Sequence, residues 1–265
     1  MPKTTVLRDI AFRELTKAAS AIAGFTFTRA EYRSAANISG LRTKTLTFSS
    51  RHDSRTQFAS DNRYGHLGKA GAWTGNDKTV VAACRRVLRG AKIPASEIAG
   101  IDVLSEMGQV AERASDGKIR VHEPTLLRKL ARARRAVAGI RVWSSYATVG
   151  LNRKGEIGWL EVHWPEVPAV VVKEAEFLQT LIKRGFKPRE LPGARPEAVE
   201  VGVIHSPAVG FFMDVITAVR VIYRGYEPNV GRKATLYFDR HGDLVSLPRE
   251  IEPAKPQPVE RPKPR

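Results

Sequence analysis

The sequence lacks several features that would place a protein in a known class at once. It has a single cysteine, Cys84, among 265 residues, which excludes an internal disulfide framework and any cysteine pair spaced for zinc or redox chemistry. It has no run of about 18 apolar residues, so we expect no membrane span. No apolar segment follows the basic N-terminus, so no signal peptide is visible; the cytoplasm is the default location, and the compartment stays open.

The motifs of common catalytic sites are also missing. The sequence has no HExxH zinc motif, no G-x-S-x-G nucleophile elbow and no G-x-G-x-x-G dinucleotide loop. None of the six histidines has a second and third ligand at metal-binding spacing. We therefore expect a protein that is not an enzyme and that holds no metal and no cofactor.

The chain does carry a large excess of basic residues. There are 44 Lys and Arg against 27 Asp and Glu, a formal net charge of +17. Apolar residues make up 42% and charged residues 27%, the balance of a folded protein. This composition leaves a basic binding module, an enzyme without cysteine chemistry, or a basic partner of an acidic protein.

Changes in patterning divide the chain into four segments. Residues 1–76 are polar and weakly periodic, apart from a modest amphipathic helix expected over Val6–Ile22, and form an irregular N-terminal region. Residues 77–166 and 167–252 each contain a helix followed by strands. Residues 253–265 form a basic tail whose prolines favour an extended conformation.

Within the two middle segments, local signals predict particular elements. A helix begins after the cap Asn76, buries Cys84 as a core thiol and ends at Gly90. The remaining expected elements are a hairpin of two strands, a second helix and three later strands: Ile140–Asn152, Glu156–Trp164, Val172–Arg184, Val199–Ile204, Val215–Tyr223 and Ala234–Phe238. Residues 126–137 consist of strong helix formers, so their propensity favours a third helix there, and a strand, which the family resemblance described next implies, is the alternative.

Two stretches of the chain resemble a known protein family. Gly139–Ile157 combines an apolar-x-Val pair, an alternating strand and an Asn-x-x-Gly turn, and Tyr237–Val245 contains a Tyr-x-Asp-x-x-Gly-x-x-Val hairpin. These stretches resemble the propeptide region of fungalysin- and thermolysin-type metalloproteases and its PepSY domain, without the catalytic domain. The resemblance implies an α+β fold of two cystatin-like or PepSY-like units, each a helix on an antiparallel sheet.

The same resemblance gives the leading functional expectation. It implies a non-catalytic binding, inhibitory or chaperone-like module that docks onto a protein partner, such as a metalloprotease. It would also imply secretion. In this interpretation the hairpin strands contact the partner, while the arginine clusters steer the encounter.

The alternative is a nucleic-acid-binding protein that uses the arginine-rich segment 118–141. On a helix, Arg128, Arg132 and Arg135 share one face, which we expect to point to solvent and to attract phosphate. With two aromatic residues of the neighbouring strand, Trp143 and Tyr146, they are the candidate binding residues. A second basic cluster, Arg85 to Lys92, follows Cys84.

Overall fold

The computed structural model describes residues 3–35, 38–51, 56–61, 75–113, 117–152, 154–185, 193–207, 213–227 and 232–245. Over these residues it contains three α-helices and one short 3₁₀ helix: α1 Lys3–Ala23, α2 Asp77–Gly90, η1 Ala95–Glu97 and α3 Ala169–Lys183. None of the described helices has the length and apolar character needed to cross a membrane.

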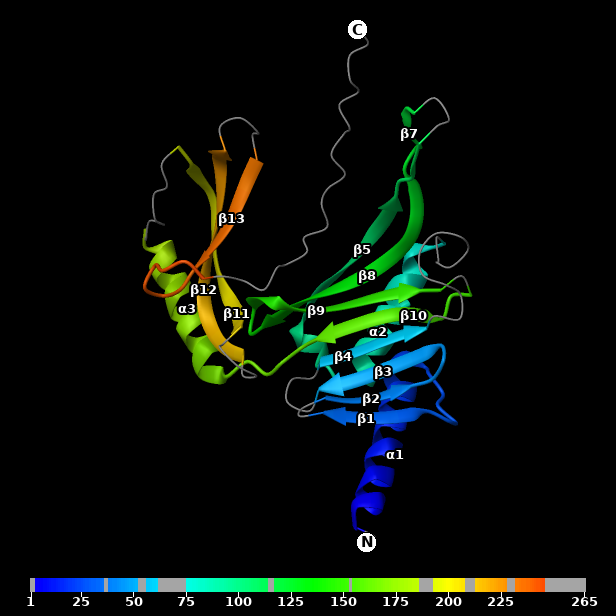
Figure 1. The fold of residues 1–265 in the computed structure, drawn as a ribbon. Coiled ribbons are helices and arrows are strands. Elements are labelled where there is room, and N and C mark those ends of the chain that lie inside the picture. The colour runs from blue at the N-terminus through cyan, green and yellow to red at the C-terminus, as the bar shows by residue number, and fades with distance from the viewer. Residues whose placement is uncertain are drawn as a thin grey trace.

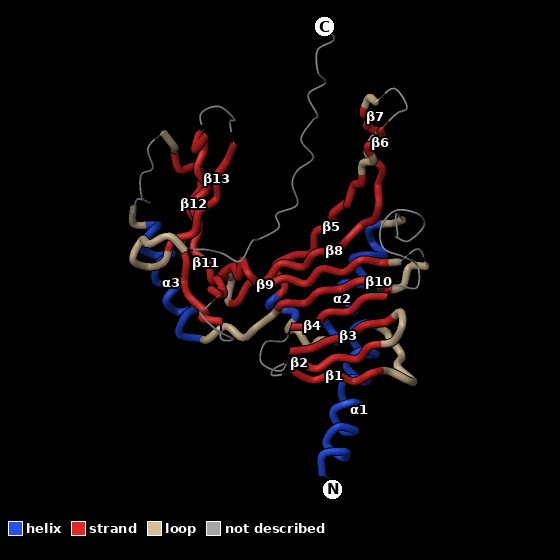
Figure 2. The backbone as a smooth tube through the Cα atoms, in the orientation of Figure 1, coloured by secondary structure: helices blue, strands red, loops and turns tan. Residues whose placement is uncertain are grey.

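Strands make up most of the described chain (Figure 2). In chain order they are β1 Glu31–Ala35, β2 Ile38–Arg42, β3 Leu46–Arg51, β4 Thr56–Asp61, β5 Ile98–Gly108, β6 Ala111–Arg113, β7 Ile119–Val121, β8 Thr125–Val137, β9 Ile140–Leu151, β10 Ile157–His163, β11 Arg195–Pro207, β12 Met213–Glu227 and β13 Arg232–Phe238. All except β6 and β7 belong to one mixed sheet of 11 strands, and β6 pairs with β7 in a separate ribbon.

Strand β9 holds the large sheet together because it changes partner along its length. Its first half pairs in parallel with β11, through Arg141 opposite Gly202, and its second half pairs antiparallel with β10. Strands β1 to β4 continue the sheet beyond β10, and β12 and β13 continue it beyond β11. On its other edge β9 pairs with β8, which pairs with β5. Figure 1 shows the two halves of the sheet meeting at β9.

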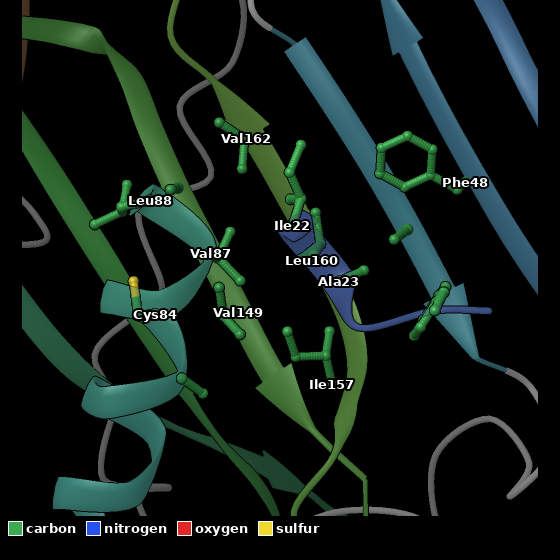
Figure 3. Packing of buried hydrophobic residues seen from close by; sticks show 14 of the residues in the cluster. Ile22, Ala23, Phe48, Cys84, Val87, Leu88, Val149, Ile157, Leu160 and Val162 are labelled. Atoms are coloured by element: carbon green, nitrogen blue, oxygen red, sulfur yellow. The ribbon is translucent and has the colours of Figure 1, made fainter. Parts of the chain in front are cut away.

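Each half of the sheet packs one face against helices. Helices α1 and α2 cover the first half, and α2, with its buried residues Cys84, Val87 and Leu88, packs against β5, β8 and β9 (Figure 3). In the second half, Val172 and Ala175 of α3 pack against β9 and β11. We call the side of the sheet that points away from these helices the open face.

Several local predictions are confirmed. The Asn76 side chain accepts a hydrogen bond from the backbone N–H of Lys78 at 2.8 Å and caps α2, which ends at Gly90. The hairpin of β9 and β10, the helix α3 and the strands β11, β12 and β13 lie where expected, each somewhat different in its bounds. Cys84 is fully buried as predicted, and burial raises the pKa of its thiol to about 12.

The predicted fold class is wrong. The structure is one mostly β sheet of 11 strands with three helices among the described residues, not two helix-plus-sheet units of cystatin or PepSY type. The N-terminal region is not irregular, because α1 and strands β1 to β4 occupy much of it. The expected helix over 126–137 is a strand, β8, which pairs with a neighbour on both edges. Tertiary pairing on two sides outweighs the helix propensity of this segment.

The contact between α1 and α2 gives a stability prediction. A Cβ atom on Gly90 would lie 2.2 Å from the backbone oxygen of Ala21, so no side-chain movement could relieve the clash. Although alanine is the better helix former, we expect Gly90→Ala to lower the free energy of unfolding by about 1–3 kcal/mol. Urea denaturation measures this, with Gly40→Ala, whose Cβ has ordinary contacts, as the control. A stabilised Gly90→Ala protein would contradict the close packing of the two helices.

Candidate nucleic-acid interface

The arginines predicted to form a solvent-facing helical stripe lie on β8, and each is engaged. Arg128 forms an ion pair with Glu106 of β5 and lies over the ring of Trp159, 5.6 Å from its centroid. Arg132 lies over the ring of Tyr146, with its guanidinium carbon 4.9 Å from the centroid. Such cation–π contacts hold a guanidinium against the sheet. The expectation of a free basic stripe is therefore wrong for these two residues.

Arg135 is a structural residue rather than a surface one. Only 2% of it is exposed, and its guanidinium pairs with Glu97 at 2.9 Å, donates to Ser145 Oγ and to the Pro165 carbonyl, and lies over Trp164. A buried guanidinium needs such complete pairing because an isolated charge is very costly in the interior. Arg135 cannot contact a partner.

The two aromatic candidates also differ in exposure, since one is half-buried and the other is buried. Tyr146 is half-buried beside Arg132 and donates its hydroxyl hydrogen to Glu161 at 2.7 Å; burial, with this contact, raises the pKa of the phenol. Trp143 is buried in the second half of the sheet, where it packs edge-to-face with Tyr237 and carries Arg220 over its ring at 5.2 Å. The structure thus brings Arg132 and Tyr146 together and places Trp143 and Arg135 elsewhere.

The burial of Arg135 predicts a large effect on stability. Arg135→Gln leaves Glu97 half-buried without its cation, so we expect a loss of about 3–5 kcal/mol in the free energy of unfolding. The exposed Arg86→Gln is the control and should change this value by less than about 0.5 kcal/mol. Equal stabilities of the two variants in chemical denaturation would contradict the structural role of Arg135.

Residues 143–145 of β9 have no partner on β8, because Arg134 pairs with Tyr146 while Arg135 pairs with Val142. Ser144 of this bulge accepts the backbone N–H of His205 at 2.8 Å and lies 2.6 Å from Nδ1 of the same residue. The His205 ring packs edge-to-face on His163 with 5.8 Å between centroids. The polar side chains of the bulge are therefore used to join β9 to β11 and β8.

Both of these histidines are neutral at physiological pH. Burial, followed by the positive charge of Arg51 and Arg135, lowers the pKa of His163 to about 4. Burial, followed by the charges of His163 and Arg135, lowers the pKa of His205 to about 3. Within the described ranges, no group of three or more His, Cys, Asp or Glu side chains could hold a metal ion.

These lowered values predict acid sensitivity. In the unfolded chain both histidines have an ordinary pKa near 6.5. Above pH 6.5 the folded and unfolded chains both hold them neutral, and the folded state has its full stability. As the pH falls below 6.5, the unfolded chain takes up protons that the folded chain does not, so the free energy of unfolding decreases until the pH reaches the folded-state pKa values of about 4 and 3. Each contributes a slope of up to about 1.4 kcal/mol per pH unit in that window. We expect His205→Asn to reduce the slope of unfolding free energy between pH 6 and 4. The exposed His241→Asn is the control, and identical slopes in the two variants would contradict the burial of a neutral His205.

The second basic cluster lies on α2 and differs from the strand arginines. Five exposed cations follow helical spacing on the side of α2 away from the core and continue just past its end: Lys78, Arg85, Arg86, Arg89 and Lys92. We call this set the α2 basic face. No ion pair among the described residues includes any of the five. The one acidic residue of α2, Asp77, is paired with Lys129 of β8 at 2.6 Å.

The α2 basic face is long enough to follow a charged polymer. From Lys78 to Arg89 the helix rises about 16 Å at 1.5 Å per residue, the length of several nucleotides. Its opposite side is buried in the core, with Val80, Cys84 and Val87 fully covered. The sequence shows this cluster plainly as Arg85 to Lys92, whereas the prediction used the larger number of arginines in 118–141.

Comparisons with known proteins leave the family open. No family model matches the chain, and no curated protein matches it. Among solved structures, one match is the crystal structure of an uncharacterized protein from Eubacterium rectale ATCC 33656, with a TM-score of 0.45 and 11% identity over 91% of this chain and 82% of that one. This likeness names neither a family nor an activity.

Proposed function

We propose that this protein is a non-catalytic binding protein for nucleic acid and that the α2 basic face contacts the phosphate backbone. The observation that carries the proposal is that its five exposed cations form no ion pair with any residue that the structure describes, whereas most of the strand arginines described above are paired or stacked. Unpaired cations on one face bind a polyanion and release its condensed counterions. Backbone contacts of this kind are independent of base sequence.

Nucleic acid fits this face better than an anionic lipid surface does. A helix that lies in a membrane interface inserts an apolar face among the lipids. The large apolar side chains Val80, Val87 and Leu88 of α2 are buried in the protein core and cannot insert. Apart from the small Ala82, the exposed positions of α2 are polar, and most of them are basic.

The proposal predicts a position-dependent loss of affinity. We expect weaker binding of a DNA duplex by the triple variant Arg85→Gln, Arg86→Gln, Arg89→Gln. The slope of the logarithm of its binding constant against the logarithm of the salt concentration should also be shallower, by up to about 0.9 for each lost phosphate contact. The matched control is Lys173→Gln, Lys183→Gln, Arg184→Gln, at exposed positions of α3 and its C-cap, which removes the same charge. Fluorescence anisotropy at several salt concentrations measures both.

The outcome is decisive in either direction. Weakened binding in the α2 variant, with near wild-type binding in the α3 variant, supports a contact at α2. Equal losses in both variants would show that only net charge matters and would contradict a defined interface. Anionic vesicles serve as a further ligand, and tighter binding to vesicles than to duplex would also contradict the proposal.

A protein partner is the second candidate function, and one surface favours it. Strands β5 and β8 extend beyond β9 and end in the ribbon of β6 and β7 (Figure 1). Four apolar side chains of this arm are 47% to 68% exposed: Met107, Val110, Ile119 and Val121. Exposed apolar clusters often mark protein contacts. The protease pro-region function stays a prediction, although the two-unit fold that it implied is wrong.

A further inference from the structure

The open face carries a second group of cations where the two halves of the sheet meet, away from α2. Arg134 of β8, Arg141 of β9 and Arg220 of β12 lie on strands that the junction brings together. Arg141 is opposite Ala136 of β8 on one edge and opposite Gly202 of β11 on the other. Gly202 in turn is opposite Ala218, two residues from Arg220.

The carboxylates at this junction do not balance the guanidinium groups. Arg134 pairs with Asp102 at 2.6 Å, and Arg220 pairs with Glu200 at 2.7 Å. Arg141 is only partly exposed and takes part in no ion pair within the described residues. Burial, followed by the charges of Arg134 and Arg220, lowers the pKa of the Arg141 guanidinium, while Glu200 and Asp102 oppose that shift.

Two further donors at the same place lack an acceptor. The Nε atom of Arg220 and the Nε1 atom of Trp143 are buried, and neither has a hydrogen-bond partner among the described residues. Only 5% of Trp143 is exposed, and its ring lies so close to β11 that a Cβ atom on Gly202 would come within 2.8 Å of it. Because Arg220 stacks on this ring, its guanidinium is fixed in place.

We propose that Arg141 and Arg220, supported by Arg134 and Trp143, form a binding site for a phosphate group on the open face. The junction is rich in donors and poor in acceptors, which a tetrahedral oxyanion with several acceptor oxygens would correct. Guanidinium forks bind phosphate in two-point contacts. The site goes beyond the proposed function, because it is separate from the α2 basic face and needs no polymer.

Calorimetric titration of the full chain with inorganic phosphate, against sodium chloride at equal ionic strength, tests this proposal. We expect saturable binding of phosphate and none of chloride. Arg141→Gln should weaken phosphate binding at least about tenfold. Arg141→Lys keeps the positive charge but loses the two-point guanidinium contact, so its phosphate affinity should lie between those of the wild type and Arg141→Gln. The matched control, Arg224→Gln at an exposed position of β12, should bind as the wild type does.

The melting temperature provides a second readout that does not depend on affinity alone. Phosphate should raise it in the wild type by ligand linkage, and should raise it less in Arg141→Gln at the same concentration. Without phosphate, Arg141→Gln should be as stable as the wild type or more stable, because it removes a like-charge repulsion. Equal phosphate binding by Arg141→Gln and the wild type would overturn the site.

Competition identifies the source of the phosphate group. A small monoester such as ribose 5-phosphate, or an oligonucleotide without terminal phosphates, is added to protein loaded with inorganic phosphate. Displacement by the monoester assigns the site to a phosphorylated small molecule, and displacement by the oligonucleotide assigns it to a nucleic-acid backbone; displacement by neither overturns the proposal. The α2 triple variant should keep its phosphate response, so failure of the nucleic-acid function is distinguishable from failure of this site.

Discussion

The bulge in β9 is the feature on which the rest of the structure depends. Strand β9 pairs with β11 over its first half and with β10 over its second. Residues 143–145, which have no partner on β8, lie between these two pairings, where a bulge bends and twists the strand. Ser144 bonds to His205 and Ser145 to Arg135, so the two serine hydroxyls of the bulge stay satisfied although they are buried, whereas the indole Nε1 of Trp143 has no partner among the described residues.

This arrangement also determines where the basic charge can act. The guanidinium of Arg135 is buried, where it donates to Ser145 of the bulge and pairs with Glu97, so it cannot bind a partner. Arg128 and Arg134 of β8 are held by carboxylates of the neighbouring strand β5. A cation that is already paired gains less from a new anion than an unpaired one does, since the existing contact competes for it. Among the described residues, the cations of the α2 basic face and Arg141 take part in no ion pair, and we assign the leading contacts to them, with Arg220 as the second ligand of the phosphate site.

The sequence predicted elements well where the signal was local. The cap Asn76, the turn after Asn152 and the apolar face of α2 with Cys84 each depend on a few neighbouring residues, and each was located correctly. The alternation of Ala131 and Ala133 with Arg132 and Arg134 was a strand signal within 126–137. It was outweighed by the helix propensity of alanine, leucine and arginine, because propensity takes no account of two pairing neighbours.

Pairing between strands that are far apart in the sequence could not be predicted from local patterns. The parallel contact of Arg141 with Gly202 joins residues far apart in the chain, and no local pattern shows that two apparent units share one sheet. The candidate site was predicted in part: the α2 cluster was visible as a run of cations. Whether a strand cation is paired depends on strand register and on the segments packed against it, which made Arg135 structural, whereas Arg85, Arg86 and Arg89 lie on the outer side of a helix and pair with no described carboxylate.

Arginine footprinting tests the central claim, that free charge on α2 holds a nucleic acid, most directly. Phenylglyoxal modifies exposed guanidinium groups, and mass spectrometry reports the modified positions with and without a DNA duplex. The account predicts that duplex protects Arg85, Arg86 and Arg89 while the exposed Arg13 and Arg184 react unchanged. Uniform protection of all five, or unchanged reactivity of the three α2 arginines in the complex, would contradict it.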